Sequence, residues 1–203
     1  MSSIDKLQDL KGVDFSSSKD ERISRENLWV EGINRGDGKA FEAMYRHYYP
    51  RLGQFLMRFV QSQKIAEDLT HNLFYNIWEK RENLEPRGTL RAYLYTSARN
   101  HALNYLDKHK NRHHVSLDNH LKLNGQENKS EESIEYKEFS RAVKIAVSQL
   151  PDRRRQIFLL HREDKLTYKE IADTLDISIK TVETQMSRSL KFLGEKLAEF
   201  RIK

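Results

Sequence analysis

The sequence contains no cysteine, which excludes a disulfide framework, a zinc site built from thiolates and a cysteine nucleophile. This fits a protein of the reducing cytoplasm. No apolar run exceeds four residues, as in 157–160, and residues 1–20 lack the apolar stretch of a secretory signal. Eight glycines and three prolines in 203 residues are too few for the turns of a β-sandwich or β-barrel. We therefore expect a cytoplasmic, helical protein without membrane insertion.

Charged side chains are abundant. They make up 33% of the chain against 37% hydrophobic residues, so the surface is large relative to the core, as in small helical domains. Lys and Arg outnumber Asp and Glu by 36 to 30, which gives a net charge of +6. This excess favours a polyanionic partner if the positive charge is concentrated in particular segments.

Helical periodicity begins near Glu26 and recurs in separate segments, whereas no useful stretch alternates with the period of a β-strand. The expected helices cover 39–49, 51–61, 64–80, 89–110, 132–150, 152–163, 168–175 and 179–200. The expected capping residues are Asp37, Thr89, Thr167 and Ser178. Pro50 is expected to break a helix, and Pro151 is expected at the first position of another.

Composition changes after residue 110, where Asn, Ser and Gly replace most of the bulky apolar residues. This predicts an all-α chain of two small helical domains joined by a flexible linker. The predicted parts are a mobile N-terminal tail over 1–25, a domain over 26–112, the linker over 113–132 and a second domain over 133–203.

Charge is unevenly distributed over this map. Residues 87–114 hold six Lys or Arg and one Asp, whereas residues 115–139 hold three Lys and six acids. Residues 177–203 are basic again, with six Lys or Arg and three Glu. Two nucleic-acid contacts joined by an acidic tether would show this pattern.

Residues 166–186 have the pattern of a helix-turn-helix. Ala172 is small where two helices would cross, and Asp176 stands at the turn position that usually holds glycine. Aspartate enters the left-handed backbone region more readily than most residues, so it is tolerated there. The apolar residues that would pack the pair are Ile171, Leu175, Ile177 and Val182.

The second helix of this motif has two faces at about 100° per residue. The predicted buried face comprises Ile179, Val182, Met186, Leu190, Leu193 and Leu197. The predicted DNA-binding face comprises Lys180, Thr181, Glu183, Thr184, Gln185, Arg188 and Lys191. Its cations suit phosphate contacts, and its amide, hydroxyl and carboxylate groups suit base contacts in a major groove.

Two helices of the first domain also carry distinctive faces. The helix over 64–80 has a polar face of Asp68, Asn72, Tyr75 and Glu79, which suits a protein partner. Asp68 and His71 alone do not predict a metal site, because no second ligand cluster accompanies them. The helix over 89–110 has an uncharged polar face of Tyr93, Thr96, Ser97, Asn100 and Asn104, which suits stacking and hydrogen bonding to exposed bases. The basic residues after it suit phosphates.

Five segments resemble, in order, those of bacterial extracytoplasmic-function sigma factors of the sigma-70 family. They are Ala40–Leu52, Ala66–Trp78, Leu94–Leu106, Leu150–Leu160 and the helix-turn-helix over 166–186. The resemblance covers about 37–200, and details of the last motif are similar to members from Bacteroidetes-type bacteria. It implies a sigma region 2 bundle over 26–112 and a sigma region 4 helix-turn-helix over 133–203.

The resemblance implies a transcription initiation factor, not an enzyme, with no cofactor and no metal. Region 2 would contact the β′ clamp helices of core RNA polymerase through Asp68, Asn72, Tyr75 and Glu79. It would recognise and melt the minus-ten element of promoter DNA through Arg87, Tyr93, Thr96, Ser97, Asn100, Asn104, Lys108 and Arg112. Region 4 would bind the minus-thirty-five element through the helix-turn-helix face and would contact the β flap. A membrane anti-sigma factor is a further implied partner.

Two other interpretations are compatible with a helix-turn-helix. The first is a transcriptional regulator that acts without core polymerase, which would need a dimerisation or ligand-sensing lobe. The second is a DNA-processing enzyme, for which Tyr105 with Arg99 and His101 is the nearest approximation to a nucleophile among cations.

Overall fold

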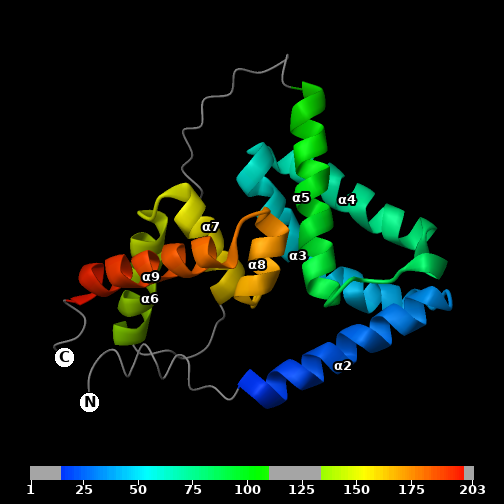
Figure 1. Cartoon of the computed structure of the whole chain (residues 1–203), viewed down its shortest axis with the longest axis horizontal. Coiled ribbons are helices and arrows are strands. Elements are labelled where there is room, and N and C mark those ends of the chain that lie inside the picture. The colour runs from blue at the N-terminus through cyan, green and yellow to red at the C-terminus, as the bar shows by residue number, and fades with distance from the viewer. Residues whose placement is uncertain (1–14, 110–133, 199–203) are drawn as a thin grey trace. The chain divides into compact units, whose positions relative to one another are not determined.

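The structure, a computed structural model, describes residues 15–109 and 134–198, and every regular element in these ranges is a helix (Figure 1). The elements are α2 (Phe15–Asn34), α3 (Gly38–Val60), α4 (Gln63–Glu79), the short 3₁₀ helix η1 (Arg81–Asn83), α5 (Leu90–His109), α6 (Ile134–Ser148), α7 (Asp152–Arg162), α8 (Tyr168–Leu175) and α9 (Ile179–Lys196). The chain divides into two compact units, Met1–Val115 and Ser116–Lys203. The predicted all-α class with two helical units is confirmed.

In the first unit, α3 is the central helix and packs against α2, α4 and α5. Its buried face follows the helical repeat, since every side chain in it lies three or four positions from another member. These residues are Met44, Tyr48, Leu52, Phe55 and Leu56. The core receives Ala66, Leu69, Leu73 and Ile77 from α4, and Leu90, Leu94, Ala98 and Ala102 from α5.

Local signals set the ends of these helices as predicted. The Asp37 carboxylate caps α3 by accepting a hydrogen bond of 2.8 Å from the backbone nitrogen of Lys39. The Thr89 hydroxyl accepts one of 3.2 Å from the backbone nitrogen of Ala92 at the start of α5. The caps predicted at Asp37 and Thr89 are therefore confirmed.

The predicted helix break at Pro50 is wrong, because α3 runs through this residue. Pro50 lies on the exposed side of α3, whereas Tyr48 and Leu52 are completely buried. Proline inside a helix costs about 3 kcal/mol, but burying one large apolar side chain contributes about 1.5–3 kcal/mol. Several such side chains on α3 outweigh the missing hydrogen bond.

The predicted tail over 1–25 needs correction for residues 15–25, which form the first turns of α2. This helix has few apolar residues, so its sequence gave no clear helical signal. It packs against α3 and α5 and buries Ile33 completely, and its Glu26, which is 2% exposed, is bonded to both of these helices. Residues 1–14 of the predicted tail lie outside the described residues.

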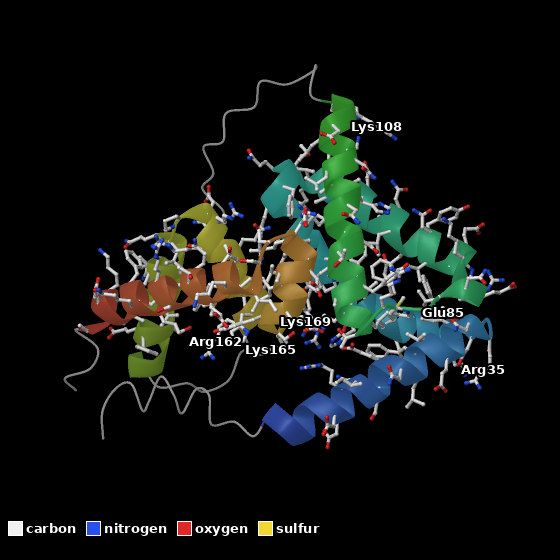
Figure 2. All side chains as sticks on the ribbon, in the orientation of Figure 1. Arg35, Glu85, Lys108, Arg162, Lys165 and Lys169 are labelled. Carbon is white, nitrogen blue, oxygen red and sulfur yellow. The ribbon has the colours of Figure 1, made fainter. Side chains whose placement is uncertain are left out.

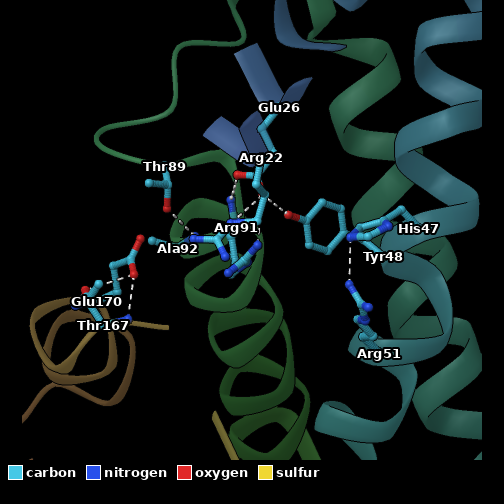
Figure 3. Close-up of polar contacts among 10 residues, drawn as sticks. All are labelled: Arg22, Glu26, His47, Tyr48, Arg51, Thr89, Arg91, Ala92, Thr167 and Glu170. Carbon is cyan, nitrogen blue, oxygen red and sulfur yellow. Dashed lines mark hydrogen bonds and ion pairs between the residues drawn. The ribbon is translucent and has the colours of Figure 1, made fainter. Parts of the chain in front are cut away.

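In the second unit, α9 packs against α6, α7 and α8. Thr167 and Glu170 form a capping box at the start of α8, with reciprocal side-chain to backbone hydrogen bonds (Figure 3). Ser178 caps α9, and Asp176 has the left-handed backbone expected at the turn, with φ of 54°. Pro151 occupies the N-cap of α7, one position before the first-turn site predicted for it.

The buried face predicted for α9 is partly wrong. Val182, Met186 and Leu193 are buried, but Ile179 and Leu190 are 45% and 40% exposed. The four buried residues, Val182, Met186, Ser189 and Leu193, span an arc of about 60°, and Ile179 and Leu190 lie about 20° and 40° beyond one edge of it. Helix α9 ends at Lys196, and residues 199–200 of its predicted end lie outside the described residues.

No helix in the described ranges is both long enough and apolar enough to cross a lipid bilayer.

Candidate nucleic-acid interface

The outward face of α9 begins at the Ser178 cap, whose hydroxyl accepts a hydrogen bond of 3.0 Å from the backbone nitrogen of Thr181. The charged residues of the predicted DNA-binding face are exposed: Lys180, Glu183, Arg188 and Lys191. Its Thr181, Thr184 and Gln185 are half-buried. A shallow surface hollow is lined by Lys180, Glu183, Thr184, Ser187 and Arg188. The structure therefore places all seven predicted residues on one helix.

A second helix contributes to this face. The Nε of Arg154, on α7, donates a hydrogen bond of 3.3 Å to Oε1 of Gln185. Gln185 is thereby oriented by a cation that sequence reasoning missed, because 31 residues separate the pair. A run of three arginines opens α7, and only the burial pattern shows that Arg155 is internal while Arg154 stays half-exposed beside α9.

Tyr168 of α8 lies close enough to Glu183 to be influenced by its charge. Burial first, and then the Glu183 carboxylate, raise the pKa of the Tyr168 phenol. A phenol is neutral at physiological pH even without this shift, so the Tyr168 hydroxyl can donate a hydrogen bond beside the predicted DNA-binding face.

The polar face of α5 is continuous along the helix. Tyr93, Thr96 and Ser97 are half-buried, and Asn100, Asn104 and Lys108 are exposed. At about 100° per residue these six lie within an arc of about 120°. Figure 2 shows Lys108 near the C-terminal end of α5, directed away from the helix bundle. Arg112 lies outside the described residues.

The loop before α5 holds Arg87, which is exposed, and Gly88, whose φ of +92° favours glycine. This turn lets α5 begin shortly after Arg87. The predicted cation is thereby kept at the N-terminal end of the polar face.

A buried polar network holds that end of α5 (Figure 3). Oε1 of Glu26 accepts hydrogen bonds of 2.6 Å from the Tyr48 hydroxyl and 3.1 Å from Nη2 of Arg91. Its Oε2 accepts one of 3.4 Å from the backbone nitrogen of Arg91, in the first turn of α5. Glu26 and Arg91 are 2% and 4% exposed. One carboxylate thus joins α2, α3 and α5, a role no local pattern indicated.

Next to this network, His47 of α3 lies among cations. Nη1 of Arg51 donates a hydrogen bond of 2.6 Å to Nε2 of His47, which must therefore be unprotonated. Burial is the main cause that lowers the pKa of His47 to about 4, and the charges of Arg51, Arg25 and Arg91 lower it further.

We expect this histidine to make the first unit less stable in mild acid. The folded-state pKa lies below the ordinary value of 6.5, so the unfolded chain binds more protons between these values. The contribution of His47 to the free energy of unfolding should fall as the pH drops from about 6.5 towards 4 and should change no further below that pH. Denaturant unfolding followed by tryptophan fluorescence measures it, because Trp29 and Trp78 both lie in the first unit.

The control is His47→Gln, which should flatten part of that pH dependence. The pKa of His101 is also lowered by burial, so this histidine contributes in the same direction. Part of the pH dependence should therefore persist in His47→Gln. An unchanged slope in His47→Gln would show that His47 is not the group responsible.

The polar face of α4 is fully outward. Asp68, Asn72, Tyr75 and Glu79 are all exposed, and at about 100° per residue they lie within an arc of about 60°. Tyr75 is 62% exposed, so its ring is accessible to a partner. His71 beside this face bonds the Tyr49 hydroxyl at 2.9 Å. No group of three residues able to hold a metal occurs among the described residues.

Two family models match the chain. One, described as Sigma-70 region 2, matches residues 44–112, and the other, Sigma-70 region 4, matches residues 140–193. Together they span both polar helix faces, on α5 and α9.

Curated relatives extend over nearly the whole chain. An "ECF RNA polymerase sigma-E factor" of Haemophilus influenzae is 24% identical over 180 residues, covering 83% of this chain and 93% of that protein. The "ECF RNA polymerase sigma factor SigW" of Bacillus subtilis is 21% identical over 178 residues, covering 84% and 95%.

Two solved structures have a similar fold. CnrH in complex with the cytosolic domain of CnrY gives a TM-score of 0.54 at 17% identity, covering 86% of this chain and 98% of that one. The sigma factor RpoE bound to the anti-sigma factor NepR from Bartonella quintana gives 0.54 at 21% identity, covering 79% and 98%. At these identities the likeness supports the fold.

Proposed function

This chain belongs to the sigma-70 family as an RNA polymerase sigma factor of the extracytoplasmic-function type, and we propose which residues perform each step of promoter recognition. The observation that carries the proposal is the presence, in one chain, of two separate outward polar faces on helices that match regions 2 and 4. Sigma factors are initiation factors: the polymerase supplies the catalysis, and this chain needs no cofactor.

In the first unit, the α4 face of Asp68, Asn72, Tyr75 and Glu79 binds the β′ clamp helices of core polymerase. The exposed Tyr75 ring provides apolar contact area that becomes buried in the complex. The surrounding acids and amides provide the polar rim typical of a protein interface.

The same unit opens the minus-ten element through α5. Extruding a base from the duplex costs a few kcal/mol. Stacking of the extruded base on an aromatic ring such as Tyr93 offsets this cost by about 1–3 kcal/mol per base. Asn100 and Asn104 offer amide groups for hydrogen bonds to base edges. Arg87 and Lys108, at opposite ends of the face, attract phosphates.

In the second unit, α9 lies in the major groove of the minus-thirty-five element. Lys180, Arg188 and Lys191 contact phosphates, and Thr184 and Gln185 contact base edges. Arg154 holds the Gln185 amide in one orientation, which favours one base pattern over others. The same unit contacts the β flap of core polymerase. The Glu183 carboxylate lies 3.9 Å from the Lys180 ammonium group and partly neutralises the positive charge of the α9 face.

The structural neighbours also support a proposal for how the activity of this protein is regulated. Both structural neighbours are complexes, and we propose that this protein too is held inactive in the cytoplasm by a membrane anti-sigma factor. A regulator acting without polymerase is not favoured, because the first unit matches region 2 and not a dimerisation or ligand-sensing lobe.

We expect purified protein to confer promoter-specific initiation on core RNA polymerase in vitro. The measurement is run-off transcription from promoters of its own genome, together with co-elution with core polymerase. Tyr75→Ala should lower the affinity for core at least several-fold. Leu28→Ala, which truncates a similarly exposed apolar residue on α2, should leave it unchanged. Absence of both transcript and co-elution would contradict the proposal.

A further inference from the structure

A cluster of cations and rings lies on α2 and α3, outside the α5 face. It comprises Arg25, Trp29, His47 and Arg51, and we call it the α2–α3 cationic patch. The Arg25 guanidinium lies over the Trp29 ring, 5.5 Å from its centroid, and the Trp29 and His47 ring centroids are 5.5 Å apart. His47 in turn accepts the hydrogen bond of 2.6 Å from Arg51. The four side chains thus form a continuous chain of contacts across two helices.

The patch has a net positive charge that is available to a ligand. Arg25 and Arg51 are exposed, and His47 is neutral because it accepts from Arg51. The nearby carboxylate of Glu26 is buried and already bonded to Tyr48 and Arg91. The charges that act on His47 are all arginines, so the local field attracts an anion.

The geometry suits a phosphodiester group. A guanidinium stacked on an indole loses little freedom on binding and presents its N–H groups at its edge. Arg51, tethered through one nitrogen to His47, retains further N–H donors. Two arginines held by aromatic neighbours can therefore contact phosphate oxygens at low entropic cost.

The patch is also coupled to the DNA-opening helix. Arg25 precedes Glu26, and Glu26 bonds both the backbone and the side chain of Arg91 in the first turn of α5. Glu26 also bonds Tyr48, whose ring centroid lies 4.8 Å from that of His47, so the patch lies near the first turn of α5. A strand bound along α5 that continues past this N-terminal end would pass close to the patch.

We propose that the α2–α3 cationic patch binds the phosphate backbone of promoter DNA and extends the contact made by α5. This rests on the proposed function, because it needs a holoenzyme that opens DNA. The patch adds affinity without base specificity, since phosphates carry no sequence information.

The test measures binding of holoenzyme to a forked promoter, with a duplex minus-thirty-five element and a single-stranded minus-ten element, over a series of salt concentrations. The variant is R25Q/R51Q. The matched control is R35Q/R46Q, which also removes two exposed arginines outside the patch, one in the turn after α2 and one on α3; Figure 2 labels Arg35 just after the C-terminal end of α2. Removing two phosphate contacts should lower the slope of log affinity against log salt by about 1.4–1.8. The control should stay near the wild-type slope.

A charge-conserving variant, R25K/R51K, should keep most of the slope, because lysine also neutralises phosphates. Core affinity and tryptophan-detected unfolding are measured for every variant. Equal slopes for R25Q/R51Q and R35Q/R46Q would contradict DNA binding by the patch and would leave the proposed function untouched. Loss of core affinity with an unchanged DNA slope would also overturn DNA binding by the patch and assign the patch to an acidic protein surface. Wild-type holoenzyme without promoter preference would instead contradict the proposed function.

Discussion

Replacing Glu26 by alanine should lower the free energy of unfolding of the first unit by about 3–5 kcal/mol, the cost of removing one partner from a buried ion pair. The side chains of Glu26 and Arg91 are 3% and 5% exposed. The substitution leaves the Arg91 guanidinium buried without its carboxylate, and the Tyr48 hydroxyl loses its acceptor. The measurement is denaturant unfolding followed by the fluorescence of Trp29 and Trp78, which reports on this unit alone.

The matched control is Glu42→Ala. Glu42 pairs with Arg46 at 2.6 Å within α3, but the two side chains are 57% and 78% exposed. Exposed pairs of this kind contribute about 0.3–0.5 kcal/mol. The double variant E26A/R91M should be less destabilised than E26A alone, since no unpaired charge stays buried. Equal effects of E26A and E42A would show that the network does not hold α2 to α5.

Single substitutions in the two polar faces should affect different steps of initiation. Asn100→Ala on α5 should weaken open-complex formation by about 10-fold or more, because a bidentate contact between an amide and a base edge is worth about 1–3 kcal/mol, and should leave closed duplex binding nearly unchanged. Arg188→Ala on α9 should weaken duplex binding of the minus-thirty-five element several-fold, with a shallower salt dependence.

Holoenzyme binding to closed duplex and permanganate reactivity of the opened strand separate these steps. Asn27→Ala on α2 and Arg141→Ala on α6 are the controls, because each removes an exposed side chain of the same type away from the two faces. If Asn100→Ala and Arg188→Ala impair both steps equally, the assignment of opening to α5 and duplex recognition to α9 is wrong.

Several features could be predicted from the sequence because their causes are local. Asp37, Thr167 and Ser178 each cap a helix through a backbone group two or three residues away. Asp176 enters the left-handed region at the turn of the helix-turn-helix. The polar faces of α4, α5 and α9 could be predicted from the helical repeat, because residues three or four positions apart lie on the same side of a helix.

Other features depend on contacts between distant segments. Pro50 stays within α3 because Tyr48 and Leu52 are buried against other helices, which the local cost of proline does not reveal. Ile179 and Leu190 are exposed because the neighbouring helices cover a narrower stripe of α9 than its apolar pattern suggests.

The sequence by itself therefore determined the helical class, most helix ends and the chemistry of the outward faces, since these arise from interactions within a few residues. Only the tertiary structure decided how polar residues from distant segments are paired. Glu26 and Arg91 are 65 residues apart, and Arg154 and Gln185 are 31 residues apart. No periodicity links such pairs. They form because burial makes an unsatisfied polar group costly, so each residue must bond whichever partner the packed helices bring to it.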